Sequence, residues 1–169
     1  MKTTLQFDFI VDKQQNTITV KKEFAAGRQL VWDYHTKAEL LEQWFAPKPF
    51  KAKSKSMDFR EGGHWLYAMI DPDGKEFLAR MDYTEVKPIS GYKLFDAFCD
   101  DKGNVNPDLP RASWAATFKD QGKENTLVET VVKYNSLAEL ETVIQMGMKE
   151  GLTMCIEQLD EILQKKGGH

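Results

Sequence analysis

The chain has 169 residues with a net charge of −3, and 41% of its residues are hydrophobic against 29% charged. This length fits one domain with a self-sufficient core, and the slightly acidic balance argues against nucleic-acid binding, which needs a basic surface. Two cysteines cannot build a disulfide framework or a zinc site, no apolar stretch is long enough for a membrane span, and the polar first residues do not resemble a signal peptide, so we expect a cytoplasmic protein.

The first predicted element is a β-hairpin. Apolar and polar residues alternate over Leu5–Phe9 and again over Thr17–Phe24, with a polar break at 12–16. A period of two around a short polar connection is typical of two antiparallel strands. Residues 1–16 are therefore expected to form an N-terminal strand extension of the domain.

Two short helices are predicted next, over residues 27–34 and 36–45. Apolar residues recur there at intervals of three and four. Thr36 and Glu39 have the spacing of a capping box, and Pro47 predicts the end of the second helix.

A long run of strands is predicted between residues 50 and 134, where the period is mostly two. Turn-forming residues separate the segments, and such short connections indicate an antiparallel meander. The predicted strands are Phe50–Phe59, His64–Ile70, Glu76–Val86, Tyr92–Cys99, Ser113–Phe118 and Thr126–Tyr134.

The last predicted element is a long amphipathic helix over residues 136–166. Ser136 and Glu139 form a second capping box, and leucines and other apolar residues follow at intervals of three and four. Gly147 and Gly151 weaken the middle of this helix, which would be about 45 Å long if continuous.

This order of elements predicts an α+β fold in a single domain over residues 1–169. A half-buried sheet has to cover its apolar face, and a long amphipathic helix has to cover its apolar stripe. The simplest solution is a curved antiparallel sheet wrapped around the C-terminal helix, which encloses more volume than the helix fills.

Aromatic and methionine residues are the best candidates for a ligand site. On the strand 64–70 we expect Trp65, Tyr67 and Met69 to point inward, because they match the bulk of alternate residues on the next strand. Two interpretations remain open at this point. These side chains are either ordinary core, which the sequence alone favours, or the wall of an apolar cavity, for which aromatic and thioether groups are well suited.

Asp96 and His64 are the candidate polar anchors. Asp96 shares its strand parity with Leu94 and Phe98, so it either points into an apolar interior or lies at a strand end in solvent. No histidine or cysteine stands at metal-ligand spacing, and no nucleophile motif is present. The sequence thus predicts no catalytic set, metal or cofactor.

A lysine-rich strand face comprises Lys51, Lys53 and Lys55. It is either a solvated edge that discourages aggregation or a contact for an acidic partner. Met57 shares the parity of these lysines, which predicts a twist or bulge between them.

An ordered set of short motifs resembles the family of activator-of-heat-shock-protein-90-ATPase homologues, within the START-like superfamily of helix-grip folds. The resemblance spans roughly residues 17–165. Its motifs are Arg28–Trp32, Leu40–Pro47, Met57–Trp65, Asp73–Gly74, Asp82–Pro88 and Gly151–Leu163.

The resemblance implies a hydrophobic cavity between sheet and long helix, since superfamily members bind lipids, sterols, polyketides or hormones. The family has no shared catalytic motif to carry over. Met81 stands where the family often has glycine, which implies a smaller cavity. The residues expected at the cavity are Trp44, Trp65, Tyr67, Met69, Tyr83, Asp96, Phe98, Trp114 and Met148.

The expected function is binding of a hydrophobic small molecule, with no nucleic-acid partner and no membrane span. Two alternatives remain. One is a cyclase- or hydrolase-type enzyme that uses a cavity carboxylate, and the other is a module that contacts a chaperone through the lysine face. Homodimerisation is left open.

Overall fold

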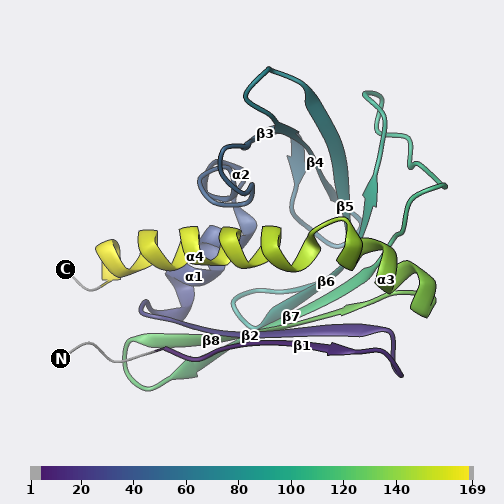
Figure 1. Cartoon of the computed structure of the whole chain (residues 1–169). Helices are drawn as coiled ribbons and strands as arrows, with labels where there is room; N and C mark the ends of the chain where they lie inside the picture. The colour runs from purple at the N-terminus through teal and green to yellow at the C-terminus, as the bar shows by residue number, and fades with distance from the viewer. Residues whose placement is uncertain (1–4, 168–169) are drawn as a thin grey trace.

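The computed structural model describes residues 5–167 and contains one curved antiparallel sheet of eight strands in the order β1-β2-β8-β7-β6-β5-β4-β3. The strands are β1 (Phe7–Asp12), β2 (Thr17–Phe24), β3 (Lys51–Asp58), β4 (His64–Ile70), β5 (Glu76–Lys87), β6 (Gly91–Phe98), β7 (Ser113–Gln121) and β8 (Asn125–Lys133). The helices are α1 (Arg28–Thr36), α2 (Ala38–Leu41), α3 (Leu137–Gln145) and α4 (Met148–Gly167). In Figure 1, α4 lies along the hollow of the sheet.

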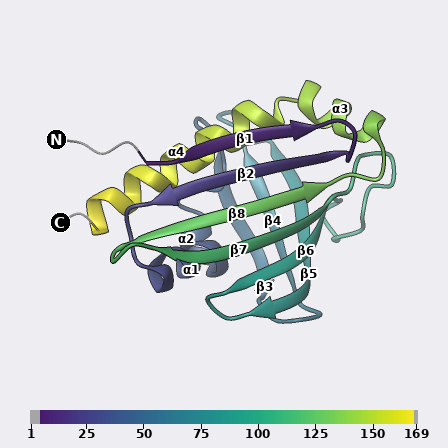
Figure 2. The ribbon, with the colours of Figure 1, turned by 90° about the horizontal axis from the view of Figure 1, so that it is seen from below.

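The strand pairing confirms the predicted meander. Strands β3 to β8 pair with their neighbours in chain order, and β2 joins the free side of β8, with Thr17 opposite Lys133. The N-terminal strand β1 pairs with β2 alone and so forms one edge of the sheet (Figure 2). The helix-grip fold expected from the order of elements is therefore confirmed.

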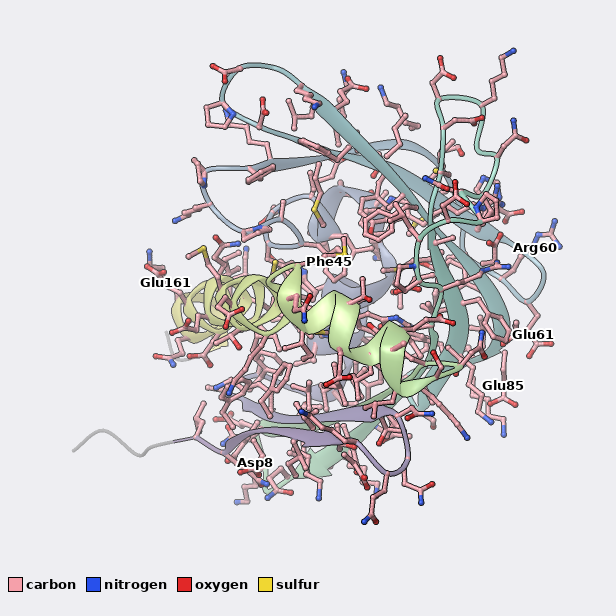
Figure 3. All side chains as sticks on the ribbon, turned by 45° about the vertical axis from the view of Figure 1, so that its right-hand side comes forward. Asp8, Phe45, Arg60, Glu61, Glu85 and Glu161 are labelled. Carbon is pink, nitrogen blue, oxygen red and sulfur yellow. The ribbon has the colours of Figure 1, made fainter. Side chains whose placement is uncertain are left out.

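The apolar stripe of α4 faces the sheet. Cys155, Leu159 and Leu163 are at most 4% exposed and belong to one core with the inward residues of the strands. Each fully buried leucine contributes roughly 1.5–3 kcal/mol to folding. Figure 3 shows the ring of Phe45 in the interior beside α4, whereas the labelled charged side chains lie at the periphery.

One of the two predicted capping boxes is confirmed in part. The Ser136 hydroxyl accepts a hydrogen bond from the Glu139 amide (3.1 Å) and caps α3. The prediction at Thr36 is wrong, because this residue ends α1 and its hydroxyl donates to the Trp32 carbonyl four residues earlier (2.9 Å). Lys37 then separates the helices, and α2 ends at Leu41.

The predicted bulge in the lysine strand lies at Lys55. The register between β3 and β4 shifts between Ser54 and Ser56. Beyond the shift Met57 is half-buried, whereas Lys51 and Lys53 are exposed. The extra residue at the bulge reverses the alternation of faces, so Met57 can point inward although it has the same parity as the exposed lysines.

The C-terminal helix is not continuous, which corrects the predicted span of 136–166. Helix α3 ends at Gln145 and α4 begins at Met148. Between them Gly147 has φ of +92°, and its amide bonds to the Ile144 carbonyl (3.1 Å). A left-handed residue ends a helix and strongly favours glycine, so the break is built into the sequence at this residue.

Two glycines four residues apart should respond to alanine in opposite directions. Gly147→Ala should lower the free energy of unfolding by about 1–2 kcal/mol, because a Cβ is unfavourable at positive φ. Gly151→Ala should raise it by about 0.5–1 kcal/mol, because Gly151 is helical and its new Cβ would meet only Pro47 Cγ at 3.8 Å. Urea denaturation of both variants tests this, and shifts of the same sign would contradict it.

Candidate functional site

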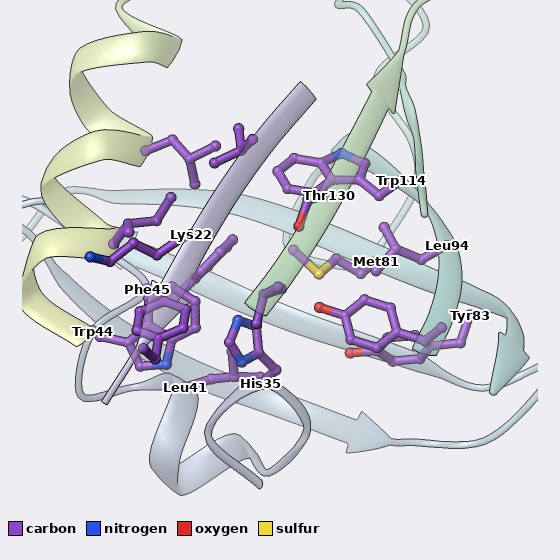
Figure 4. A pocket seen from close by; sticks show the side chains of 16 residues that line it. Lys22, His35, Leu41, Trp44, Phe45, Met81, Tyr83, Leu94, Trp114 and Thr130 are labelled. Atoms are coloured by element: carbon purple, nitrogen blue, oxygen red, sulfur yellow. The ribbon is translucent and has the colours of Figure 1, made fainter. Parts of the chain in front are cut away.

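The space between the sheet and the helices contains two chambers. The large chamber has a volume of about 340 Å³ and extends from β4–β7 to the junction of α3 and α4. The small chamber, shown in Figure 4, has about 50 Å³ and lies between α1, β2 and β5. Four residues line both chambers and form a shared wall, namely Phe45, Met81, Trp114 and Leu152.

The large chamber reaches the surface between β5 and the end of α3. Phe77 and Met146 both line it, and they are 43% and 52% exposed. Pro110, from the loop before β7, lines it too. An apolar molecule could therefore enter between apolar side chains.

Most residues expected at the cavity line one of the chambers. Tyr67, Met69, Asp96, Phe98 and Met148 line the large chamber. Trp44 and Tyr83 line the small chamber, and Trp114 belongs to the shared wall. Whether any of them binds a ligand remains a prediction.

Trp65 lies behind the wall rather than on it, which corrects its expected position. Its side chain is 0% exposed and stacks on Tyr67 with ring centroids 3.9 Å apart. Its indole N–H donates to the Ser54 hydroxyl (2.9 Å). Trp65 thus supports the ring of Tyr67, which faces the chamber.

Asp96 points inward, as one of the two interpretations of its parity expected. One carboxylate oxygen accepts the Ala112 amide (2.7 Å), and the other accepts the indole N–H of Trp114 (2.7 Å). Burial raises the pKa of Asp96, because desolvation outweighs these two donors and the nearby Arg111. The two hydrogen bonds hold the carboxylate in place at the wall of an apolar chamber.

His64 does not serve as a second anchor. It alternates with the inward residues Trp65 and Tyr67, so it lies on the outer face of β4, where its Nε2 is 2.8 Å from the Ser56 hydroxyl. It lines neither chamber.

Tyrosine hydroxyls supply further polar groups to both chambers. Tyr67 and Tyr134 line the large chamber, and Tyr83 and Tyr92 line the small one. Burial raises the pKa of all four, so they stay protonated at neutral pH. Within residues 5–167 their hydroxyls make no hydrogen bond to protein, which leaves them available to water or a ligand.

Sequence reasoning missed His35, which lines the small chamber (Figure 4). Its Nδ1 lies 2.8 Å from the Val31 carbonyl, so Nδ1 carries the proton and Nε2 has a free lone pair. Burial lowers the pKa of His35 from 6.5 to about 4. The spacing of four residues from buried Val31 was the available signal that His35 shares the inward face of α1.

The small chamber is large enough for ordered water. At about 30 Å³ per water, its 50 Å³ holds one or two molecules. His35 Nε2 accepts hydrogen bonds, whereas the Tyr83 and Tyr92 hydroxyls can donate them. The chamber is thus a small, mostly apolar pocket that carries a few hydrogen-bonding groups.

The remaining charged groups do not form a comparable site. Lys51 and Lys53 are exposed on the edge strand β3, and Lys55 pairs with Glu76 (3.0 Å). In the part of the chain that the structure describes, no group of three or more His, Cys, Asp or Glu residues could hold a metal ion. Over the same residues no helix is long and apolar enough to cross a membrane.

The chain is similar in sequence and in fold to known proteins. The family model described as Activator of Hsp90 ATPase homolog 1-like protein matches residues 25–164. The crystal structure of protein Ms6760 from Mycobacterium smegmatis is 30% identical, with a TM-score of 0.85 over 95% of this chain and 97% of that one. Among curated proteins, none matches.

Two further solved structures share the fold at lower identity. A protein from Arthrobacter aurescens is 23% identical, with a TM-score of 0.87 over 94% of this chain and 91% of its own. The AHSA1 protein from Silicibacter pomeroyi is 17% identical, with a TM-score of 0.68 over 89% of this chain and 99% of its own.

The buried imidazole predicts a loss of stability in acid. Between pH 6.5 and 4 the unfolded chain protonates His35 and the folded chain does not, so the free energy of unfolding falls as pH falls. From pH 7 to pH 4.5 this one residue should cost about 2 kcal/mol. Urea denaturation at both pH values measures the loss.

His35→Phe keeps an aromatic ring against Trp44 and Phe118, and it should remove that part of the pH dependence. His64→Asn, which removes a histidine from the outer face of the sheet, is the matched control. Equal pH dependence in the wild type and His35→Phe would refute the assignment.

Proposed function

The chain belongs to the family of Activator of Hsp90 ATPase homolog 1-like proteins, and we propose that it binds an apolar or amphipathic small molecule in the large chamber. The observation that carries this proposal is the chamber itself, whose volume of about 340 Å³ falls within the range of roughly 300–1,000 Å³ for ligand sites. Protein interiors are otherwise close-packed, so an apolar space of this size is unusual and favours a role in binding.

The lining of the large chamber supports binding by apolar burial. Met69, Met146 and Met148 line it near its rim and helix junction, and unbranched thioethers adapt to ligands of different shape. Asp96, Tyr67 and Tyr134 add polar atoms at defined positions. Such a site gains affinity from buried area and orientation from a few hydrogen bonds.

The enzyme alternative uses the same chamber. A cyclase or hydrolase of this type requires a carboxylate inside the cavity near a second polar group, and Asp96 shares the chamber with two tyrosine hydroxyls. Any such reaction begins with binding in this space, so binding is the function to establish first.

The chaperone alternative relies on the lysine face. Exposed lysines on an edge strand are sufficient to prevent pairing with another sheet, and Lys55 already has Glu76 as its partner. The charge on β3 therefore needs no protein partner to explain it.

Filling the chamber should abolish binding. Ala79 lines the large chamber, whereas Ala115, which follows the lining residue Trp114 on β7, faces the other side of the sheet. A neutral, environment-sensitive naphthalene dye should bind the wild type with a blue shift in emission. Ala79→Phe should weaken its binding at least tenfold, about 1.4 kcal/mol, and Ala115→Phe should leave it unchanged.

Fluorescence titration measures the affinity of the dye for the three proteins, and thermal unfolding checks that each is folded. No binding to the wild type, or equal binding to all three proteins, would reject the large chamber as the site.

A further inference from the structure

Asp96 is the only aspartate, glutamate, lysine, arginine or histidine among the 20 residues that line the large chamber. No lysine, arginine or histidine is among them. The chamber therefore presents one carboxyl group and no cationic side chain.

The carboxylate of Asp96 forms no salt bridge within residues 5–167, although the charge of Arg111 lies near enough to lower its pKa in part. Arg111 is the nearest candidate, but its guanidinium pairs with Asp82 (3.1 Å), donates to the main-chain oxygen of Asp96 (3.2 Å) and lies over the ring of Phe95. Each carboxylate oxygen accepts one N–H and can accept another hydrogen bond. A buried carboxylate is costly unless it is paired, so the chamber is set up for a positively charged partner.

The walls around Asp96 are also suited to a cation. Trp114 donates its indole N–H to Asp96, which places an aromatic ring beside the carboxylate. Aromatic faces attract organic cations, most strongly where water is excluded. The aromatic residues of the chamber are Phe45, Tyr67, Phe77, Phe98, Trp114 and Tyr134.

We propose that the ligand of the large chamber is an apolar amine whose ammonium group pairs with Asp96 and whose hydrocarbon body fills the rest of the space. This inference rests on the proposed function. An amine would both neutralise the carboxylate and bury its apolar part, whereas a carboxylate ligand would bring a second negative charge next to the first. The volume equals roughly eleven water molecules at about 30 Å³ each, which fits one aromatic ring with a short alkyl chain.

Three probes of similar shape test the charge preference: 4-phenylbutylamine, 4-phenylbutanol and 4-phenylbutyrate. Isothermal titration calorimetry with the wild-type protein should give an affinity for the amine at least tenfold above that for the alcohol, and the acid should bind weakest. This ranking decides the outcome without any variant.

Asp96→Asn identifies the residue responsible. It should reduce the affinity for the amine to that for the alcohol and leave the affinity for the alcohol within about twofold. Asp101→Asn, an exposed loop residue, makes the same change in net charge and should preserve the preference for the amine.

The outcomes separate the two proposals. If alcohol and amine bind equally well to the wild type, or if Asp96→Asn folds and keeps the amine preference, the amine assignment is wrong and the binding function stands. If none of the three probes binds, while the neutral dye also fails to bind, the proposed function fails together with this inference.

Discussion

A single helix cannot fill the concave face of an eight-stranded sheet, and the interior of this protein follows from that mismatch. The sheet curves because it is twisted and pairs from β1 to β3 without a break, while α4 contributes only one apolar stripe. Large aromatic side chains fill part of the remaining volume, and the two chambers are what they leave. The high content of aromatic and methionine residues in the chain is the chemical counterpart of this geometry.

The strands were predictable from the sequence because their signals are local. The period of two and the turn residues between segments define His64–Ile70 at both ends, and they define the meander that forces neighbouring strands to pair. The sequence indicates the region of the helix break but not the residue at which it occurs. Gly147 and Gly151 look alike in sequence, but only Gly147 adopts positive φ, because tertiary packing decides which of them ends the helix.

The sequence predicts which side chains point to the inner face of the sheet, but not which of them reach the chamber. Parity placed Trp65 and Tyr67 on the same inward side, yet Tyr67 lines the large chamber and Trp65 is buried behind it, since the stacking of the two rings is a contact in three dimensions. His35 was missed because a lone histidine carries no motif. Its surroundings come from β2, α1 and β7, which only the folded chain brings together.

The shared wall gives the interior an unusual capacity to change during evolution. Met81 stands between the two chambers and carries no structural hydrogen bond, so its replacement by a small residue would merge the two spaces while the backbone of β5 keeps its pairing. Other members of a fold with this plan could therefore differ in the number and size of their compartments through one side chain. The backbone pairing of the sheet thus does not depend on the side chain that divides the space inside it.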